Sequence, residues 1–171
     1  TVYRNYGASL DPLLTLPAPA TIGETLDDLA PGPAGRFDRG AHLTVKLYSG
    51  ALAGVGDALA LEGRANMAIR GADGAWEIFA FAEAELVAHD TYRLSRLLRG
   101  LGGEEALAAR TVPAGATVVL LDRAVVPLTS GLSSVGVTLN LRVGGAGSAS
   151  DAAAYVALDA TATSKAFLRS E

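Results

Sequence analysis

The sequence predicts an all-β protein, mostly an antiparallel sandwich or barrel, with one or two short helical turns and a proline-rich N-terminal arm. Three observations support this fold class. Apolar and polar residues alternate with a period of two from His42 onward, glycine-rich turns separate the alternating runs at regular spacing, and no long helical pattern interrupts them. Short strands at regular spacing favour antiparallel sheets over a parallel α/β fold.

The first 40 residues contain five of the seven prolines. Because each proline fixes φ and removes a backbone donor, we expect residues 1–40 to form a largely irregular arm or lead-in. Within it, residues 21–30 are compatible with a single helical turn, in which Thr21 and Glu24 would form a capping box. The chain starts without Met, so we expect it to be a piece of a longer protein.

Residues 41–145 carry the clearest strand patterns and are predicted to form a β-rich tail-protein domain. In the run 42–50, Leu43, Val45 and Leu47 alternate with polar side chains. This alternation predicts a strand that places those three side chains in the core.

A second alternating run spans residues 59–70, and Gly63 within it predicts a bulge or a sharp bend. Residues 71–74 (GADG) have the composition of a turn. A hairpin should therefore join this run to a third alternating segment at 76–90.

Shorter elements complete the predicted domain. We expect strands at 91–94, 117–122 and 137–143, a turn or short helix at 95–100, and a helical turn at 104–110. Residues 146–171 would then hold the rest of a small-residue linker that starts at Gly144, followed by a final strand from Tyr155 or the start of a next domain.

The composition excludes several classes of protein. The chain has 171 residues, which suits one compact domain, with or without a loosely attached end. A formal net charge of -4 without a basic patch disfavours specific nucleic-acid binding. The absence of Cys excludes disulfides, thiolate nucleophiles and Cys-based metal sites. No apolar run approaches the roughly 18 residues of a membrane span.

Glu83 and Glu85 are candidates for hydrolytic chemistry, since on a strand both carboxylates would emerge on one face, about 7 Å apart at the backbone. Glycosidases use paired carboxylates that flank a scissile bond inside a cleft, whereas two acids on one strand usually form a solvated face. We therefore keep a glycoside hydrolase fragment only as a less favoured alternative.

The two histidines, His42 and His89, lie far apart in sequence and have no acid at metal-ligand spacing, and His89-Asp90 is better explained as a turn. The sequence also lacks a phosphate-binding loop ending in G-K-[ST] and a G-x-S-x-G nucleophile elbow. We predict no catalytic residue, no metal site and no cofactor.

Arg93, Arg96 and Arg99 recur at every third position and would form a basic stripe if residues 95–99 were helical. From this pattern we predict partner contacts at Arg96, Arg99 and Glu104. The more ordinary interpretation leaves Arg93 on the exposed face of a strand and pairs Arg96 and Arg99 with Glu83, Glu85, Glu104 or Glu105, because exposed charge pairs are common and contribute little.

Trp76, Phe79 and Phe81 could stack against sugars, which gives a carbohydrate-binding module as the alternative function. Aromatic residues are scarce in this chain, however, at 6%. At least Trp76 is therefore expected in the core.

Several blocks resemble the C-terminal part of phage tail-tip proteins, and in particular the large baseplate protein of gene transfer agents. The resemblance covers roughly residues 17–145. Its most specific blocks are Trp76-Glu77, residues 84–87 (AELV), residues 92–95 (YRLS) and residues 97–100 (LLRG). The chain departs from the family at Gly103, where the family commonly has threonine, and at Ala80, where it tends to have glutamine, which weakens any claim about contacts there.

The resemblance implies a non-enzymatic structural module of a phage-like tail tip or baseplate. Such a protein is made in the bacterial cytoplasm and assembles at the tail tip of a virion-like particle. Its expected partners are other tail and baseplate proteins, copies of itself, as a trimer in the particle, and a host-envelope glycan. The full-length proteins of the family also have, in another region, a TIM-barrel-like segment that resembles glycoside hydrolases. This chain is too short to contain such a segment as well.

Overall fold

The computed structural model describes residues 1–5, 9–16, 18–128, 137–144 and 156–161. The chain divides into two compact units. The first combines the two ends of the chain, Thr1–Pro19 and Val126–Glu171, and the second is Ala20–Val125. Both are built mainly of antiparallel strands, which confirms the predicted all-β fold class.

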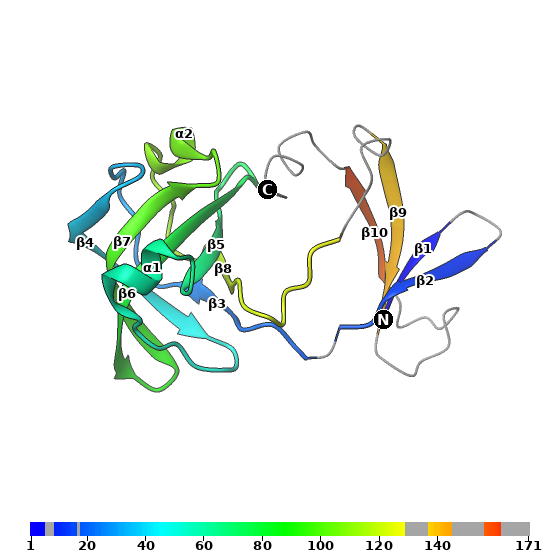
Figure 1. The fold of residues 1–171 in the computed structure, drawn as a ribbon, viewed down its shortest axis with the longest axis horizontal. Helices are drawn as coiled ribbons and strands as arrows, with labels where there is room; N and C mark the ends of the chain where they lie inside the picture. The colour runs from blue at the N-terminus through cyan, green and yellow to red at the C-terminus, as the bar shows by residue number, and fades with distance from the viewer. Residues whose placement is uncertain (6–8, 17, 129–136, 145–155, 162–171) are drawn as a thin grey trace. The chain divides into compact units, whose positions relative to one another are not determined.

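The second unit is a closed six-stranded barrel in which every neighbouring pair of strands is antiparallel (Figure 1). In order around the barrel, the strands are β3 (Ile22–Thr25), β4 (Phe37–Leu47), β7 (Thr91–Leu101), β6 (Trp76–Ala88), β5 (Asn66–Arg70) and β8 (Thr117–Leu120). Pairing of β8 with β3 closes the barrel. Closure leaves no continuous open sheet edge in this unit.

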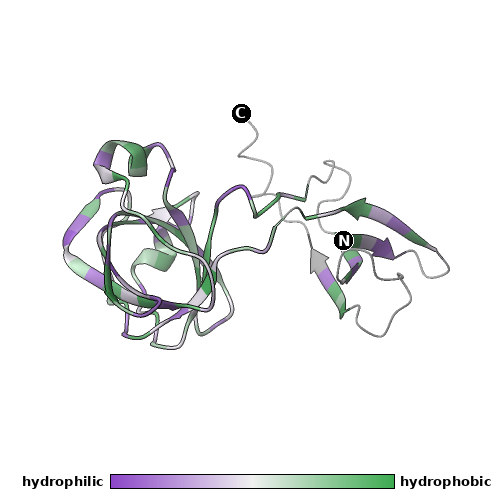
Figure 2. Cartoon of the chain, turned by 90° about the horizontal axis from the view of Figure 1, so that it is seen from below, coloured by the Kyte–Doolittle hydropathy of each residue, from purple (hydrophilic) through white to green (hydrophobic). Residues whose placement is uncertain are grey.

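The barrel core follows from the alternation in the sequence. Leu43, Val45 and Leu47 of β4 are buried, as predicted. They pack with buried residues of the other long strands, namely Met67, Ile69, Phe79, Phe81, Tyr92, Leu94, Leu97 and Val118. In Figure 2, hydrophilic and hydrophobic stretches are interspersed along the ribbons of the barrel. Burial of this one face is the main source of the unit's stability.

Two short helices lie outside the barrel strands. Helix α1 (Gly56–Leu61) packs on β6, where alanines such as Ala80 and Ala82 allow a close approach. Helix α2 (Glu105–Ala108) lies against β7. Within the described part of the chain, no helix is long and apolar enough to cross a membrane.

The first unit contains a four-stranded antiparallel sheet. Its strands lie in the order β10 (Val156–Thr161), β9 (Thr138–Val143), β1 (Val2–Asn5) and β2 (Leu10–Leu14). Val2, Leu139 and Leu141 form its small buried cluster. This sheet joins strands from both ends of the chain, whereas the barrel is formed by the continuous stretch between them.

Several predicted elements are confirmed. The strand expected at 42–50 is the end of β4, the hairpin at 71–74 joins β5 to β6, and the helical turn at 104–110 is α2. The strands expected at 117–122, at 137–143 and from Tyr155 are β8, β9 and β10. In the predicted linker 144–150, only Gly144 is among the described residues.

Other predictions were wrong. The proposed turn of helix at 21–30 is strand β3, and residues 95–100 belong to β7. The first part of the run 59–70 is helical, because Leu59 to Leu61 end α1. The supposedly irregular arm 1–40 contains β1, β2, β3 and the start of β4. The two compact units divide the chain after residues 19 and 125, and the predicted domain boundaries after residues 40 and 145 stay a prediction.

Candidate functional site

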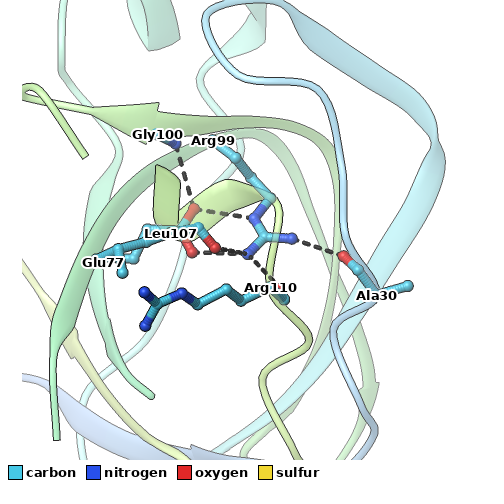
Figure 3. Close-up of polar contacts among 6 residues, drawn as sticks. All are labelled: Ala30, Glu77, Arg99, Gly100, Leu107 and Arg110. Atoms are coloured by element: carbon cyan, nitrogen blue, oxygen red, sulfur yellow. Dashed lines mark hydrogen bonds and ion pairs between the residues drawn. The ribbon is translucent and has the colours of Figure 1, made fainter. Parts of the chain in front are cut away.

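The most heavily bonded polar group in the barrel is the side chain of Arg99 (Figure 3). It is 1% exposed and forms a bidentate ion pair with the carboxylate of Glu77, which is 2% exposed. Arg99 Nε and Nη2 donate to Glu77 Oε1 and Oε2 at 2.9 and 2.6 Å. The backbone N–H of Gly100 also donates to Glu77 Oε1, at 3.2 Å.

The remaining donors of Arg99 bind backbone carbonyls from three other points of the chain. Nη1 donates to the oxygen of Ala30 at 2.6 Å, and Nη2 lies 3.3 Å from the oxygen of Arg110 and 3.5 Å from that of Leu107. A buried ion pair is tolerated when such hydrogen bonds replace lost water. The Arg99 cluster therefore ties β6, β7, the segment before β4 and the α2 region together.

This position does not fit the predicted partner contact at Arg99. The prediction assumed a helical stripe, but residues 95–99 are strand, and the guanidinium of Arg99 points into the protein. Of the nearby acids, the buried partner is Glu77, which the sequence analysis did not consider for this pairing. Both residues occupy core-facing positions, Glu77 two positions before Phe79 and Arg99 two after Leu97.

Arg96 lies on the surface and forms a separate cluster. It donates to Asp57 of α1 and, at 3.4 Å, to Glu83 of β6, which agrees with the predicted pairing of Arg96 to a nearby acid. The Ser95 hydroxyl donates to Glu83 at 2.7 Å. These bonds, that of Ser95 first, lower the pKa of the Glu83 carboxyl below its ordinary value. A partner contact at Arg96 remains a prediction.

The other predicted site residues are dispersed. Glu104 stands directly before α2 and is partly buried, and its partner contact also stays a prediction. Glu83 and Glu85 share the exposed face of β6 opposite Ser95 and Arg93, and neither lines the two cavities described below. A glycosidase needs both acids inside a cleft and an acid whose pKa is raised, yet the pKa of the Glu83 carboxyl is lowered.

The aromatic residues divide between core and surface. Phe79 and Phe81 are buried in the barrel, so they cannot stack on a sugar in this structure. Trp76 is 43% exposed, and its predicted place in the core was wrong because it lies on the outward face at the start of β6. One aromatic side chain of the proposed platform is therefore accessible.

The histidines are not gathered with acids into a metal site. His42 is exposed on β4, and His89 lies at the predicted turn, with Nδ1 2.8 Å from the carboxylate of Asp90. Across the residues that the structure describes, no group of three His, Cys, Asp or Glu side chains is placed to hold a metal ion.

Two hollows lie beside the β5–β6 turn. The larger, about 480 Å³, is bounded by residues 70–74 and 113–117. The smaller, about 200 Å³, is lined by Glu77, Arg110 and neighbours. The Arg110 guanidinium is paired with Asp73 at 2.6 Å. A hydrogen bond from the Ala75 N–H, followed by the Arg110 charge, lowers the pKa of Asp73.

The register of the barrel assembles an apolar row that sequence reasoning missed. Ile78 lies opposite Ala68, Ala68 opposite Val119, and Val119 opposite Ile22. Tyr48 continues the row, since its N–H donates to the oxygen of Ile22 at 2.9 Å. We call Ile78, Ala68, Val119, Ile22 and Tyr48 the outer apolar row.

The outer apolar row faces away from the core, because its strand neighbours, such as Met67, Val118 and Leu47, are buried inside the barrel. Tyr48 is 63% exposed and Ile22 38% exposed. Apolar side chains gathered on an outer face with polar residues around them are typical of a protein-binding surface. Only the strand pairing reveals the row, because its residues are scattered over four strands and the end of a fifth.

Residues 20–119 match the family described as Rcc01698-like, C-terminal. The match covers more than half of the chain. The chain belongs to this family. The Rcc01698-like, C-terminal match starts just before β3 and ends within β8, so it corresponds to the barrel, including the Arg99 cluster and the outer apolar row. A comparison with curated proteins found no match.

Proposed function

We propose that the chain is a structural module of a phage-like tail tip or baseplate, which acts by protein–protein assembly and contact with the host envelope. One observation carries the proposal: the closed barrel keeps its Arg99 cluster inside, while its outer face carries the outer apolar row, of which Ile22 and Tyr48 are exposed, Ile78 and Val119 partly exposed and Ala68 buried. The resemblance of residues 17–145 to tail-tip proteins overlaps the family match at 20–119.

The mechanism follows from rigidity and exposed surface. A barrel pairs its strands around a full circle, and the Arg99 cluster fixes the segments that cross its end. Such a unit can present side chains in a constant arrangement to other tail proteins and to further copies of the chain, expected as a trimer. It works at the tail tip of a particle assembled in the bacterial cytoplasm, and no step of this function requires catalysis.

The exposed Trp76 keeps a second candidate open, a module that binds envelope glycans. With Phe79 and Phe81 buried, this binding would depend on Trp76 and on polar neighbours. Titration of envelope polysaccharide into the full chain tests the idea. If Trp76→Ala leaves any glycan affinity unchanged, Trp76 is not the sugar platform, while a loss of about tenfold or more supports it.

The proposed location can be tested by imaging particles. An affinity tag inserted in the exposed turn at Glu62, after α1, would be decorated with a gold-labelled binder and viewed by negative stain. We expect the label at the distal end of the tail, and untagged particles provide the control. Label on the head, or particles that never incorporate the tagged chain, would contradict a tail-tip role.

A further inference from the structure

The two ends of strand β6 each carry exposed apolar side chains. At its start, Trp76 lies opposite Arg70 of β5, beside the outer apolar row. At its end, the β6–β7 hairpin extends beyond the last pair with β5, at Ala80. Beyond Ala80 the outer edge of β6 has no strand paired to it, whereas β4 flanks β7 up to the turn, where the Leu47 N–H donates to the oxygen of Asp90.

The hairpin tip carries apolar side chains next to an acid. Leu86 is 62% exposed, Val87 is also exposed, and the exposed Glu85 precedes them. Leu86 and Val87 are neighbours in the chain, and contiguous exposed apolar side chains are a feature of surfaces that bind other proteins. We call residues 85–87 the hairpin tip.

The opposite end of β6 offers a complementary surface. The outer apolar row supplies apolar side chains, and Trp76 lies beside it, two positions before Ile78 on β6. The 480 Å³ hollow lies next to it, where β5 and β8 stop pairing beyond Ile69 and Val118. Arg70 borders this hollow and makes no ion pair with any residue that the structure describes.

These two surfaces cannot meet within one chain. Trp76 and Leu86 lie ten residues apart on one strand, which corresponds to roughly 33 Å along its length. A paired strand of a closed barrel cannot fold back over that distance. Contact between them therefore requires a second molecule.

We propose that a second copy of this chain docks its hairpin tip on the outer apolar row, with Glu85 of one copy facing Arg70 of the other. The charges are opposite, and Leu86 and Val87 provide apolar surface for the row and Trp76. Because each copy uses a different surface on its two sides, the contact is head-to-tail and can close into a ring.

This inference rests on the proposed function, since it names the surfaces by which copies of a tail module would assemble. The two can fail separately. Particle imaging tests the tail location, whereas the contact between copies is tested with the purified full chain.

Charge reversal tests the contact. Sedimentation equilibrium of the full chain, from micromolar to millimolar concentration, should show self-association. Arg70→Glu or Glu85→Arg should each weaken it about tenfold or more, because each places like charges across the contact. The double variant, and an equimolar mixture of the two single variants, should recover it. Glu62→Arg, an exposed reversal away from both surfaces, should assemble like the unmodified chain.

Circular dichroism would confirm that each variant keeps its β-rich fold, as expected for exposed positions. The proposal is overturned if the unmodified chain stays monomeric at millimolar concentration. It is also overturned if both single reversals assemble normally, or if neither the double variant nor the mixture recovers association.

A cross-linking experiment gives an independent readout, because the chain contains no Cys. We expect a mixture of Arg70→Cys and Glu85→Cys chains to oxidise mainly to the mixed 70–85 dimer. A preference for 70–70 or 85–85 dimers would instead indicate a symmetric contact and would refute the head-to-tail arrangement.

Discussion

The clusters around Arg99 and Arg96, both on β7, differ in burial and in hydrogen-bond partners, and these two properties set how much each contributes to the free energy of unfolding. Arg99 is buried, and its guanidinium has a paired carboxylate and backbone carbonyls around it. Arg96 is partly exposed, and its partners are Asp57, which is also partly exposed, and the exposed Glu83, so water reaches this cluster more than it reaches Arg99. They lie three positions apart on the strand, which places their side chains on opposite sides of the barrel wall.

The difference shows that burial, and not the number of ion pairs, decides what an arginine does for a fold. Surface pairs contribute up to about 1 kcal/mol, whereas loss of one partner from a buried pair costs about 3–5 kcal/mol. Arg99 thus belongs to the architecture of the barrel. Arg96 belongs to its surface, where a neighbouring protein could contact it.

A local irregularity of β7 separates the clusters. Leu94 and Leu97 both face the core although they lie three residues apart, which simple alternation forbids. Arg96 between them has φ 56, in the left-handed region. This conformation reverses the alternation and returns Leu97, and then Arg99, to the inner face, while the pairing of β7 with β6 keeps its register across Arg96.

The largest effect is expected for Arg99→Met. It leaves the Glu77 carboxylate buried without its cation, so the free energy of unfolding should fall by about 3–5 kcal/mol in urea denaturation. Arg93→Met, at an exposed position of the same strand, should cost less than about 0.5 kcal/mol. Equal losses in the two variants would refute the contrast between buried and exposed arginines.

A second test concerns Gly100, which donates to Glu77. It has φ 68, and an added Cβ would lie 2.9 Å from Glu105 Cα and 3.0 Å from Ala34 Cβ. Gly100→Ala should therefore lower the free energy of unfolding by about 2–3 kcal/mol. Gly103 also has positive φ but nothing within 4 Å of that position, so Gly103→Ala should cost only about 1 kcal/mol. The difference between the two variants isolates the crowding around the Arg99 cluster.

A smaller effect is expected at Arg96. Arg96→Ala loses the surface pairs and keeps a side chain in the left-handed conformation, so it should cost about 1 kcal/mol. Arg96→Gly loses the same pairs but relieves the strain, and should be at least as stable as the Ala variant by thermal unfolding. A clearly less stable Gly variant would show that the backbone of Arg96 is not strained.

The smallest change is expected for Ser95→Ala. Without the Ser95 hydrogen bond, the pKa of Glu83 should rise toward its ordinary value, which an NMR titration of the side-chain carboxyl would measure. A lowered folded-state pKa stabilises the fold above the ordinary carboxyl pKa, and this contribution disappears as the pH falls through the folded value. The Ala variant should therefore lose less stability on acidification. An unchanged pKa would mean that Arg96 dominates instead.

The sequence predicted the strands whose alternation is complete, as in β4, where each apolar residue from Leu43 to Leu47 is buried. It failed where backbone geometry interrupts alternation, as at Arg96, and where an aromatic residue lies on the outward face of a strand, as Trp76 does. Capping chemistry at Thr21 was also misleading, because pairing of β3 with both β4 and β8 outweighs the propensity of a short helix.

The candidate site was less accessible to sequence reasoning than the fold. The pairing of Glu77 with Arg99 could have been suspected, since both stand at core positions of alternating runs and buried charges need partners. The outer apolar row could not, because it exists only through the registers of neighbouring strands. Local patterns set which face a residue occupies, and tertiary pairing sets its neighbours on that face.

The chain enters the barrel through β3 and leaves it through β8, and these two strands are hydrogen-bonded neighbours, with the Leu120 N–H donating to the oxygen of Thr21 at 2.9 Å. In the sequence, the barrel is therefore an insertion with adjoining start and end, placed between the two chain segments that form the first unit. An inserted domain whose first and last strands are neighbours can be replaced by another such domain in evolution. Only the two junctions near residues 20 and 125 would change, and the strands of the first unit would keep their sequence and pairing.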